Sequence, residues 1–133
     1  MEDWKQRIHD VLGDDNERSF RNSMRWRTHL LGVLPLPIRV TGIEDFSWEE
    51  PYIFGGWDQQ EYEKLKKTRP SYTDVFQLLD IQEPKGYNDL IAKLRRVSDG
   101  KVFYLGLSWL RTEHKIDPMY MELHNYSVWH CNY

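Results

Sequence analysis

Apolar residues in the first quarter of the chain recur at helical spacing. Two apolar stripes stand out: Trp4, Ile8, Val11 and Leu12, then Phe20, Met24, Leu30 and Leu31. Gly13 provides a stop for the first helix, residues 14–16 offer caps for the second, and Pro35 cannot continue it. The pattern therefore predicts one or two helices within residues 1–34.

After Pro37 apolar residues recur at every second position, which is typical of strands. Five segments become strand candidates: residues 38–41, 71–81, 88–97, 101–107 and 126–133. The tripeptide Ser98-Asp99-Gly100 is the strongest hairpin signal in the chain. Residues 89–97 also fit helical spacing. We favour a strand there, because the hairpin turn needs a partner for the strand that follows it.

Five short strands with tight connections are typical of an SH3-like, partly open barrel. Residues 108–110 fit a single turn before the last strand, and the charged stretch 58–67 predicts a loop with a helical turn. We therefore predict an α+β, mainly β fold in a single domain, residues 1–133. Its helical N-terminal segment, residues 1–34, is expected to pack on a five-stranded β-barrel formed by residues 35–133.

The composition of the 133-residue chain narrows the choice of function. Hydrophobic residues make up 40% and charged residues 29%, as in folded domains rather than disordered chains. The net charge is -3, and no strong basic excess marks a nucleic-acid-binding face. No apolar run approaches the roughly 20 residues that span a bilayer, and Met1 is not followed by a secretion signal. We expect a small soluble, cytoplasmic protein of bacterial type, without nucleic-acid or membrane partners.

Motifs for common enzymatic chemistry are absent: the sequence has no P-loop, no dinucleotide fingerprint and no paired zinc cysteines. Cys131 lies near His124 and His130, the one arrangement that resembles a nucleophile or soft-metal site. His130 and Cys131 are adjacent, so in a strand their side chains point to opposite faces. A buried cysteine beside a surface histidine is the commoner arrangement. We therefore predict a non-enzymatic protein, with a hydrolase as the third hypothesis.

Acidic residues gather in and around the segment that follows the first predicted strand. From this clustering we predict six metal ligands: Glu44, Asp45, Glu49, Glu50, Asp80 and Glu83. Calcium takes about six to eight oxygen ligands, which loop carboxylates supply well. A solvated acidic face would give the same clustering and is the commoner arrangement. The cofactor of this first hypothesis is Ca²⁺.

The six tryptophans divide into two groups by their surroundings. Four of them fall in apolar patterns and are predicted core residues: Trp4, Trp26, Trp109 and Trp129. Trp48 and Trp57 lie in polar, loop-like stretches, where they could form an exposed patch beside acidic residues. Such a patch suits a protein partner with a basic surface, so Trp48 and Trp57 are predicted partner-binding residues.

Several motifs, which span residues 20–133, resemble the cyanobacterial-type calcium-binding protein CcbP family. They are Met24-x-Trp26, Leu30-Leu31, Leu34-Pro35-Leu36, Pro70-Ser71-Tyr72-Thr73-Asp74, Asp117-Pro118, Tyr126-Ser127-Val128-Trp129 and Asn132-Tyr133. Leucines stand here in place of the family's Phe-Pro-Phe. The resemblance implies a small SH3-like barrel and calcium binding. It assigns no ligands, and the six carboxylates above come from clustering alone.

Two hypotheses from different classes therefore lead. The first is a non-enzymatic calcium-binding protein that uses acidic loop residues. The second is a protein-interaction module without a metal, with Trp48 and Trp57 in its contact surface. Carboxylates that converge from separate segments would favour the first hypothesis. Exposed tryptophans without convergent oxygens would favour the second.

Overall fold

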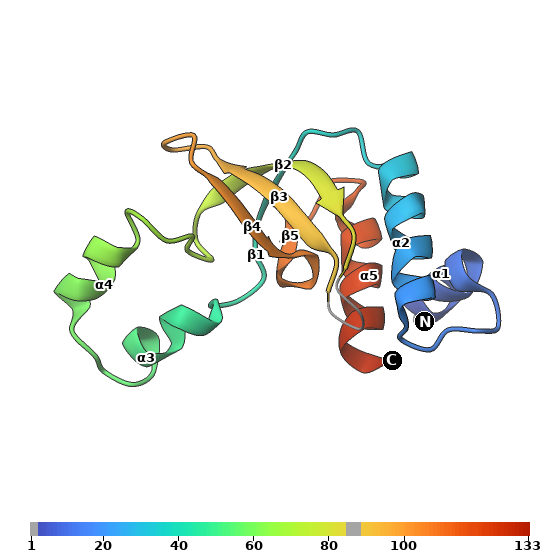
Figure 1. Cartoon of the computed structure of the whole chain (residues 1–133), viewed down its shortest axis with the longest axis horizontal. Coiled ribbons are helices and arrows are strands. Elements are labelled where there is room, and N and C mark those ends of the chain that lie inside the picture. The colour runs from blue at the N-terminus through green and yellow to red at the C-terminus, as the bar shows by residue number, and fades with distance from the viewer. Residues whose placement is uncertain (1–2, 85–88) are drawn as a thin grey trace.

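The computed structural model describes residues 3–84 and 89–133, and Figure 1 shows how its elements are arranged. Two helices open the chain, as the apolar stripes predict: α1, Asp3–Leu12, and α2, Phe20–Val33. The Ser19 side chain caps α2 by accepting a hydrogen bond from the backbone N–H of Asn22 at 3.1 Å. Helix α2 ends before Pro35, at the predicted place.

The strands form one antiparallel sheet: β1, Ile38–Gly42; β2, Val75–Gln82; β3, Ile91–Arg96; β4, Val102–Gly106; and β5, Leu110–Thr112. Their order is β4-β3-β2-β1-β5, so β4 and β5 are its two edges and the sheet is not closed. A 3-10 helix, η2 (Leu107–Trp109), lies between β4 and β5, where the sequence predicts a turn. The predicted α+β fold with a five-stranded, partly open barrel is confirmed.

The hairpin between β3 and β4 forms at the predicted turn. Gly100 has a φ of 76°, in the left-handed region that glycine adopts without a steric cost. Arg96 donates its backbone N–H to the Lys101 carbonyl at 2.8 Å, which closes the turn. Within the described part of residues 88–97, the strand rather than the helix is correct, since β3 pairs with both β2 and β4.

The predicted last strand, residues 126–133, is wrong. This segment belongs to a helix, α5, which spans Tyr120–Asn132. Leu123, Tyr126 and Trp129 are buried at a spacing of three residues, which places them on one helical face. The aromatic and β-branched residues of the segment have a high intrinsic propensity for strands. Packing against the other helices nevertheless stabilises a helix here. The fifth strand is instead the three-residue β5.

Helices α1, α2 and α5 pack together, with α2 and α5 against the sheet and α1 on their outer side (Figure 1). We call this part, residues 3–42, 75–84 and 89–133, the body. Its core is apolar and aromatic, with Trp26 fully buried between Tyr126 and Trp129 at ring-centroid distances of 5.8 and 6.2 Å. None of the helices in the described part of the chain is long and apolar enough to cross a membrane.

Residues 43–74, between β1 and β2, stand away from the helices of the body on the left of Figure 1. We call this segment the lobe. It holds three short helices: η1, Ser47–Glu49; α3, Glu50–Ile53; and α4, Gln59–Leu65. Asp58 caps α4 through its side chain, which accepts the backbone N–H of Gln60 at 2.9 Å. The helical turn predicted within residues 58–67 is therefore present.

Candidate functional site

Glu49 is the centre of the lobe. Its side chain is fully buried and each carboxylate oxygen accepts two hydrogen bonds. Oε2 accepts from the Tyr62 hydroxyl at 2.6 Å and the Ser71 hydroxyl at 2.7 Å. Oε1 accepts from the backbone N–H groups of Tyr72 at 2.9 Å and Phe46 at 3.2 Å. These four donors come from separate parts of the lobe, so Glu49 holds its segments together.

Burial, followed by the hydrogen bond to Glu49, raises the pKa of Tyr62 well above its ordinary value. The Tyr62 hydroxyl therefore stays protonated and keeps donating to the carboxylate at physiological pH. Within the described residues Glu49 forms no ion pair with a lysine, arginine or histidine. Its charge is compensated by hydrogen-bond donors alone, which requires that the lobe stay closed around it.

Aromatic rings pack around this centre. Tyr52 and Tyr62 stack with their ring centroids 5.3 Å apart, and Trp48 meets both rings edge-on. The Trp48 indole N–H donates to the Pro70 carbonyl at 2.7 Å, and Arg69 lies over its ring. These contacts fix the orientation of Trp48, which is half-buried and packs against the core.

Arg96, at the end of β3, ties the lobe to the sheet. Its side chain is buried and forms ion pairs with Asp74 at 3.0 Å and Asp99 at 2.7 Å. It also donates to three carbonyls at the end of the lobe, those of Lys66, Lys67 and Arg69. A guanidinium has five N–H donors in a planar fork, which suits this number of acceptors. The lobe is therefore anchored to the body at a defined angle.

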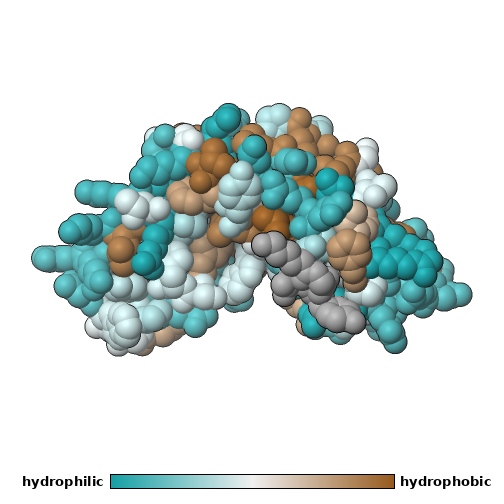
Figure 2. Space-filling model, viewed as in Figure 1, coloured by the Kyte–Doolittle hydropathy of each residue, from teal (hydrophilic) through white to brown (hydrophobic). Residues whose placement is uncertain are grey.

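A groove of about 330 Å³ lies between the lobe and the body, and we call it the aromatic groove. It is lined by Phe46, Ser47, Trp48, Leu105, Gly106 and Trp109. Figure 2 shows the surface hollowed between lobe and body, with apolar side chains gathered above the hollow. Phe46 and Trp109 meet edge-to-face at 6.3 Å, so the two walls are already in contact at one end.

Gly106 leaves room for the Trp109 ring, which forms one wall of the aromatic groove. A Cβ atom at this position would lie 3.1 Å from Cδ1 of Trp109 and 2.5 Å from Oδ2 of Asp89. A larger residue would therefore displace the Trp109 ring or the Asp89 carboxylate. Asp89 in turn accepts hydrogen bonds from the Tyr126 hydroxyl and from the backbone N–H and hydroxyl of Ser108. The position of η2, and with it Trp109, is thus set by a hydrogen-bonded network behind the groove.

A second hollow, of about 340 Å³, lies on the other side of Trp109, and we call it the polar compartment. It is lined by Arg18, Glu44, Ser108, Trp109, His130 and Cys131. Arg18 donates to the His130 carbonyl at 2.9 Å, which holds its guanidinium at the end of α5.

The two predicted partner-binding tryptophans differ. Trp57 is 57% exposed, as predicted for a contact residue, and its ring meets that of Tyr52 at 5.6 Å. Trp48 is half-buried and lines the aromatic groove. Trp109 was predicted in the core; it does pack against the core and it also lines both hollows. The sequence carries no signal for this second role, because it depends on the approach of the lobe.

The six predicted metal ligands lie in three separate places. Glu44 and Asp45 follow β1, Glu49 and Glu50 lie in η1 and α3, and Asp80 and Glu83 lie at the end of β2. Within residues 3–84 and 89–133, no three acidic, histidine or cysteine side chains gather closely enough to hold a metal ion. The assignment of these six carboxylates as metal ligands stays a prediction.

Glu49 itself is occupied by its four donors, as described above. Asp80 accepts the backbone N–H of Ile81 at 2.8 Å, and Glu44, which is exposed, lines the polar compartment.

Cys131 and His130 adjoin the polar compartment on α5. The expected buried cysteine beside a surface histidine is wrong, because Cys131 is exposed and His130 is half-buried. Burial, followed by the charge of Asp89, raises the pKa of the Cys131 thiol. A raised pKa keeps the thiol protonated near neutral pH, which disfavours it as a nucleophile. Burial lowers the pKa of His130, so that its ring is neutral. In the helix the two side chains also diverge, as adjacent residues do, so they form no nucleophile–base pair.

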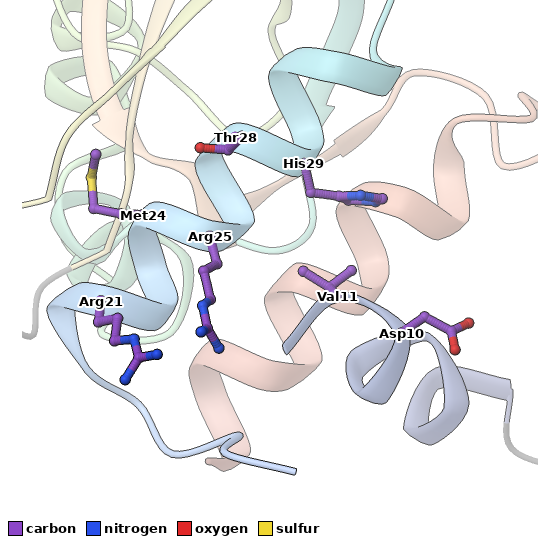
Figure 3. A pocket seen from close by; sticks show the side chains of 7 residues that line it. All are labelled: Asp10, Val11, Arg21, Met24, Arg25, Thr28 and His29. Carbon is purple, nitrogen blue, oxygen red and sulfur yellow. The ribbon is translucent and has the colours of Figure 1, made fainter. Parts of the chain in front are cut away.

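An open hollow between α1 and α2 has a volume of about 440 Å³ (Figure 3). Arg21 and Arg25 extend from the same side of α2, while Asp10 lies apart from them on α1. Arg25 donates to the Leu12 carbonyl at 3.1 Å, and so satisfies the end of α1. His29 contacts Glu122 at 2.8 Å, which links α2 to α5. These side chains hold the three helices together.

Comparison with known proteins supports the fold. No protein-family model matches the sequence, and no curated protein matches it. The crystal structure of CcbP from Anabaena is similar to this chain, with a TM-score of 0.59 at 14% identity. The similarity covers 95% of this chain and 87% of that chain. It confirms, at the level of the fold, the resemblance to the CcbP family predicted from the sequence.

Proposed function

We propose that this chain is a non-enzymatic protein-interaction module that binds an extended segment of a partner protein in the aromatic groove. The observation that carries the proposal is the groove itself, an apolar hollow walled by Phe46, Trp48 and Trp109. Concave, largely apolar and aromatic surfaces of this kind are where proteins bind partner segments. Tryptophan and tyrosine contribute most to the affinity of such contacts.

The rigidity of the groove supports the same proposal. Trp48 is held by the Pro70 carbonyl and by packing around Glu49, and Trp109 is held by the network behind η2. A binding surface that is ordered before the partner arrives loses less conformational entropy on binding. Trp57 adds an exposed aromatic ring to the same lobe. A partner that extends beyond the groove would contact it.

The experiment that tests the proposal is selection from a random peptide library displayed on phage, with the folded chain as the target. Affinities of the selected peptides are then measured by isothermal titration calorimetry for the wild type and two variants. Ser47→Arg places a long side chain in the groove at an exposed position. Gln60→Arg is the matched control, with the same charge change at an exposed position of α4 outside the groove.

We expect Ser47→Arg to weaken binding at least about tenfold, and Gln60→Arg to leave it within about twofold. Circular dichroism spectra of both variants should match that of the wild type, because both positions are exposed. The proposal is overturned if the library yields no binding peptide, or if the selected peptides bind the Ser47→Arg variant as tightly as the wild type.

Calcium binding is the second candidate function, and the similarity of the fold to that of CcbP favours it. A ligand that binds only the native state raises the midpoint of thermal unfolding by mass action. Metal-stripped protein is therefore heated with and without millimolar calcium, with magnesium as the control. A rise in Tm that is specific to calcium would support this candidate. An unchanged Tm would leave the CcbP likeness as a statement about the fold alone.

A further inference from the structure

Strand β4 forms one edge of the sheet, and its hydrogen bonds to β3 show which of its backbone groups are free. At one end of this ladder Arg96 donates its backbone N–H to the Lys101 carbonyl, and at the other end Leu107 donates to the Leu90 carbonyl. The register between these two pairs has no irregularity. Hydrogen-bonded and non-hydrogen-bonded pairs alternate along an antiparallel ladder. Every second residue of β4 therefore bonds to β3, and the residues between them turn their N–H and C=O groups to the free edge.

Val102 and Tyr104 are residues of β4 that do not bond to β3. Their backbone N–H and C=O groups point to the free edge, where no other group in residues 3–84 and 89–133 binds them. Gly106 has the same parity in the ladder and lines the aromatic groove, so the unpaired edge leads into the groove. An extended segment of a partner can continue a sheet at such an edge as a further strand.

The two edges of the sheet differ in how they are protected. An edge strand is usually kept from pairing with another chain by charges, a proline, a bulge or a very short length. Strand β5 has only three residues, and one of them is Arg111. Strand β4 has five residues, VFYLG, without a charge, a proline or a register shift. Strand β4 is thus the edge that is open to a further strand.

The aromatic groove determines what the inward side chains of an added strand should be. Residues directly opposite each other in a sheet point to the same face. Leu105 lines the groove, and its partner on β3, Ala92, is fully buried, so this face points towards the core. A residue of an added strand opposite Leu105 would therefore lie on the side of the groove walls formed by Phe46 and Trp48. Apolar side chains suit this side.

Basic residues determine what suits the other face. Val102 and Tyr104, whose side chains are 44% and 54% exposed, point outward beside Arg95 and Lys93, their partners on β3. Within the described residues neither of these cations forms an ion pair, although Asp80 on β2 is the register partner of Lys93. Acidic side chains on an added strand would compensate this positive charge. A second copy of the chain would instead bring a second pair of the same cations.

We infer that the partner segment binds as an antiparallel strand along β4, with apolar side chains on the side of the aromatic groove alternating with acidic side chains on the outer face. Its backbone bonds to the free groups of Val102 and Tyr104, and its acidic residues lie beside Lys93 and Arg95. This inference rests on the proposed function, because it states how the segment is bound and which residue types it carries. The acidic neighbours of Trp48 in the sequence predict a basic partner, so the charge of the segment separates the two predictions.

Five capped synthetic peptides of equal length test the inference. The first alternates glutamate and valine, the second replaces the glutamates with lysines, and the third replaces the valines with serines. The last two are glutamate–valine peptides with the same number of N-methylated backbone amides, either at the glutamates or at the valines. Affinities are measured by isothermal titration calorimetry, and amide hydrogen exchange is followed by NMR in the free and the bound protein.

We expect the glutamate–valine peptide to bind at least about tenfold more tightly than the lysine and serine peptides. In an antiparallel pair, residues that face each other as a hydrogen-bonded pair exchange both hydrogen bonds. The glutamates lie opposite Val102 and Tyr104, so methylation of the glutamate amides should abolish binding. Methylation of the valine amides, which face solvent, should leave the affinity within about threefold. Each methylated peptide is therefore the matched control for the other.

Hydrogen exchange reports the added strand directly. The amides of Val102 and Tyr104 should exchange quickly in the free protein and at least about tenfold more slowly with the glutamate–valine peptide. The amides of Phe103 and Leu105, which bond to β3, should be protected in both states. A ligand bound in the groove through its side chains alone would leave the first pair of amides unprotected.

The charge of the outer face is tested with two variants. Arg95→Gln removes one of the cations beside the added strand and should weaken the glutamate–valine peptide about threefold. Lys115→Gln removes the same charge at an exposed position after β5, the opposite edge of the sheet, and should leave the affinity unchanged.

The inference is overturned if the glutamate–valine peptide binds no better than the lysine peptide, if Val102 and Tyr104 stay unprotected in its presence, or if the two methylated peptides bind alike. It is also overturned if these amides become protected without peptide as the protein concentration rises, because a second copy then occupies β4. If the phage library meanwhile yields peptides that depend on Ser47, the proposed function stands without strand pairing. If neither the library nor the synthetic peptides bind, the inference and the proposed function both fail.

Discussion

The body and the lobe each have a buried centre, and the two centres differ in chemistry. In the body, Trp26 lies in a cluster of apolar and aromatic side chains from three helices and the sheet. In the lobe, the carboxylate of Glu49 accepts four hydrogen bonds among tyrosine and tryptophan rings. One centre is stabilised by removing apolar surface from water, the other by satisfying a buried charge.

The two parts also differ in whether their buried side-chain polar atoms have hydrogen-bond partners. In the described part of the body, five buried side-chain atoms lack a hydrogen-bond partner: Asn22 Oδ1, Ser23 Oγ, Trp26 Nε1, Asn125 Oδ1 and His130 Nδ1. The described part of the lobe has none. A large apolar core offsets the cost of a few unpaired groups, whereas a segment as short as the lobe needs each polar group satisfied.

The largest expected effect is in the body. Trp26→Ala should lower the free energy of unfolding by about 3–5 kcal/mol, because it leaves a cavity among Tyr126, Trp129 and the α2 residues around it. Urea unfolding followed by circular dichroism measures this loss. Phe54→Ala, at a lobe residue that is 78% exposed, is the control and should change stability by less than about 0.5 kcal/mol. A small loss for Trp26→Ala would mean that the body core is not the main source of stability.

A smaller and local effect is expected in the lobe. Glu49→Gln replaces an acceptor oxygen with an NH₂ donor that faces other donors, which should cost about 1–3 kcal/mol. Hydrogen exchange of the Phe46 and Tyr72 amides, which donate to Glu49, should accelerate while the β-sheet amides stay protected. Glu50→Gln, one residue further on and exposed, is the matched control. Equal acceleration in sheet and lobe would show that the two parts open as one unit.

The smallest expected effect concerns the ion pairs of Arg96, which anchor the lobe to the body. The hydrogen bond from Arg96 lowers the pKa of Asp99 from 3.8 to about 2. A carboxyl with a lowered pKa contributes stability above its unfolded pKa and loses it as the pH falls through its folded pKa. The stability difference between wild type and Asp99→Asn should therefore be constant above about pH 4 and shrink towards pH 2. Urea midpoints measured across this range test it; a difference that grows on acidification would contradict the prediction.

The local parts of the fold could be predicted from the sequence. The two N-terminal helices follow from apolar stripes and end signals, and the β3–β4 hairpin follows from Asp99 and Gly100, whose turn chemistry acts over a few residues. The C-terminal helix could not be predicted in the same way. Tyr126, Val128 and Trp129 favour a strand by themselves, and the burial pattern that makes them helical depends on Trp26, about a hundred residues away in the chain.

The candidate site was predictable only in part. The exposure of Trp57 follows from its polar surroundings, which are local. Glu49 was grouped with its acidic neighbours as a metal ligand, whereas the structure buries it among donors from Tyr62, Ser71 and Tyr72. These donors lie more than ten residues away, so no spacing rule links them to Glu49.

By itself, the sequence determined the helical start and the β3–β4 hairpin, because periodicity and turn chemistry act between near neighbours. Its motifs also determined the kind of family that the chain resembles. Only the tertiary structure decided that the last segment is a helix and that Glu49 holds the lobe closed. It also decided that Trp48 and Trp109, 61 positions apart in the chain, line one groove. Those outcomes depend on long-range packing, which no local pattern encodes.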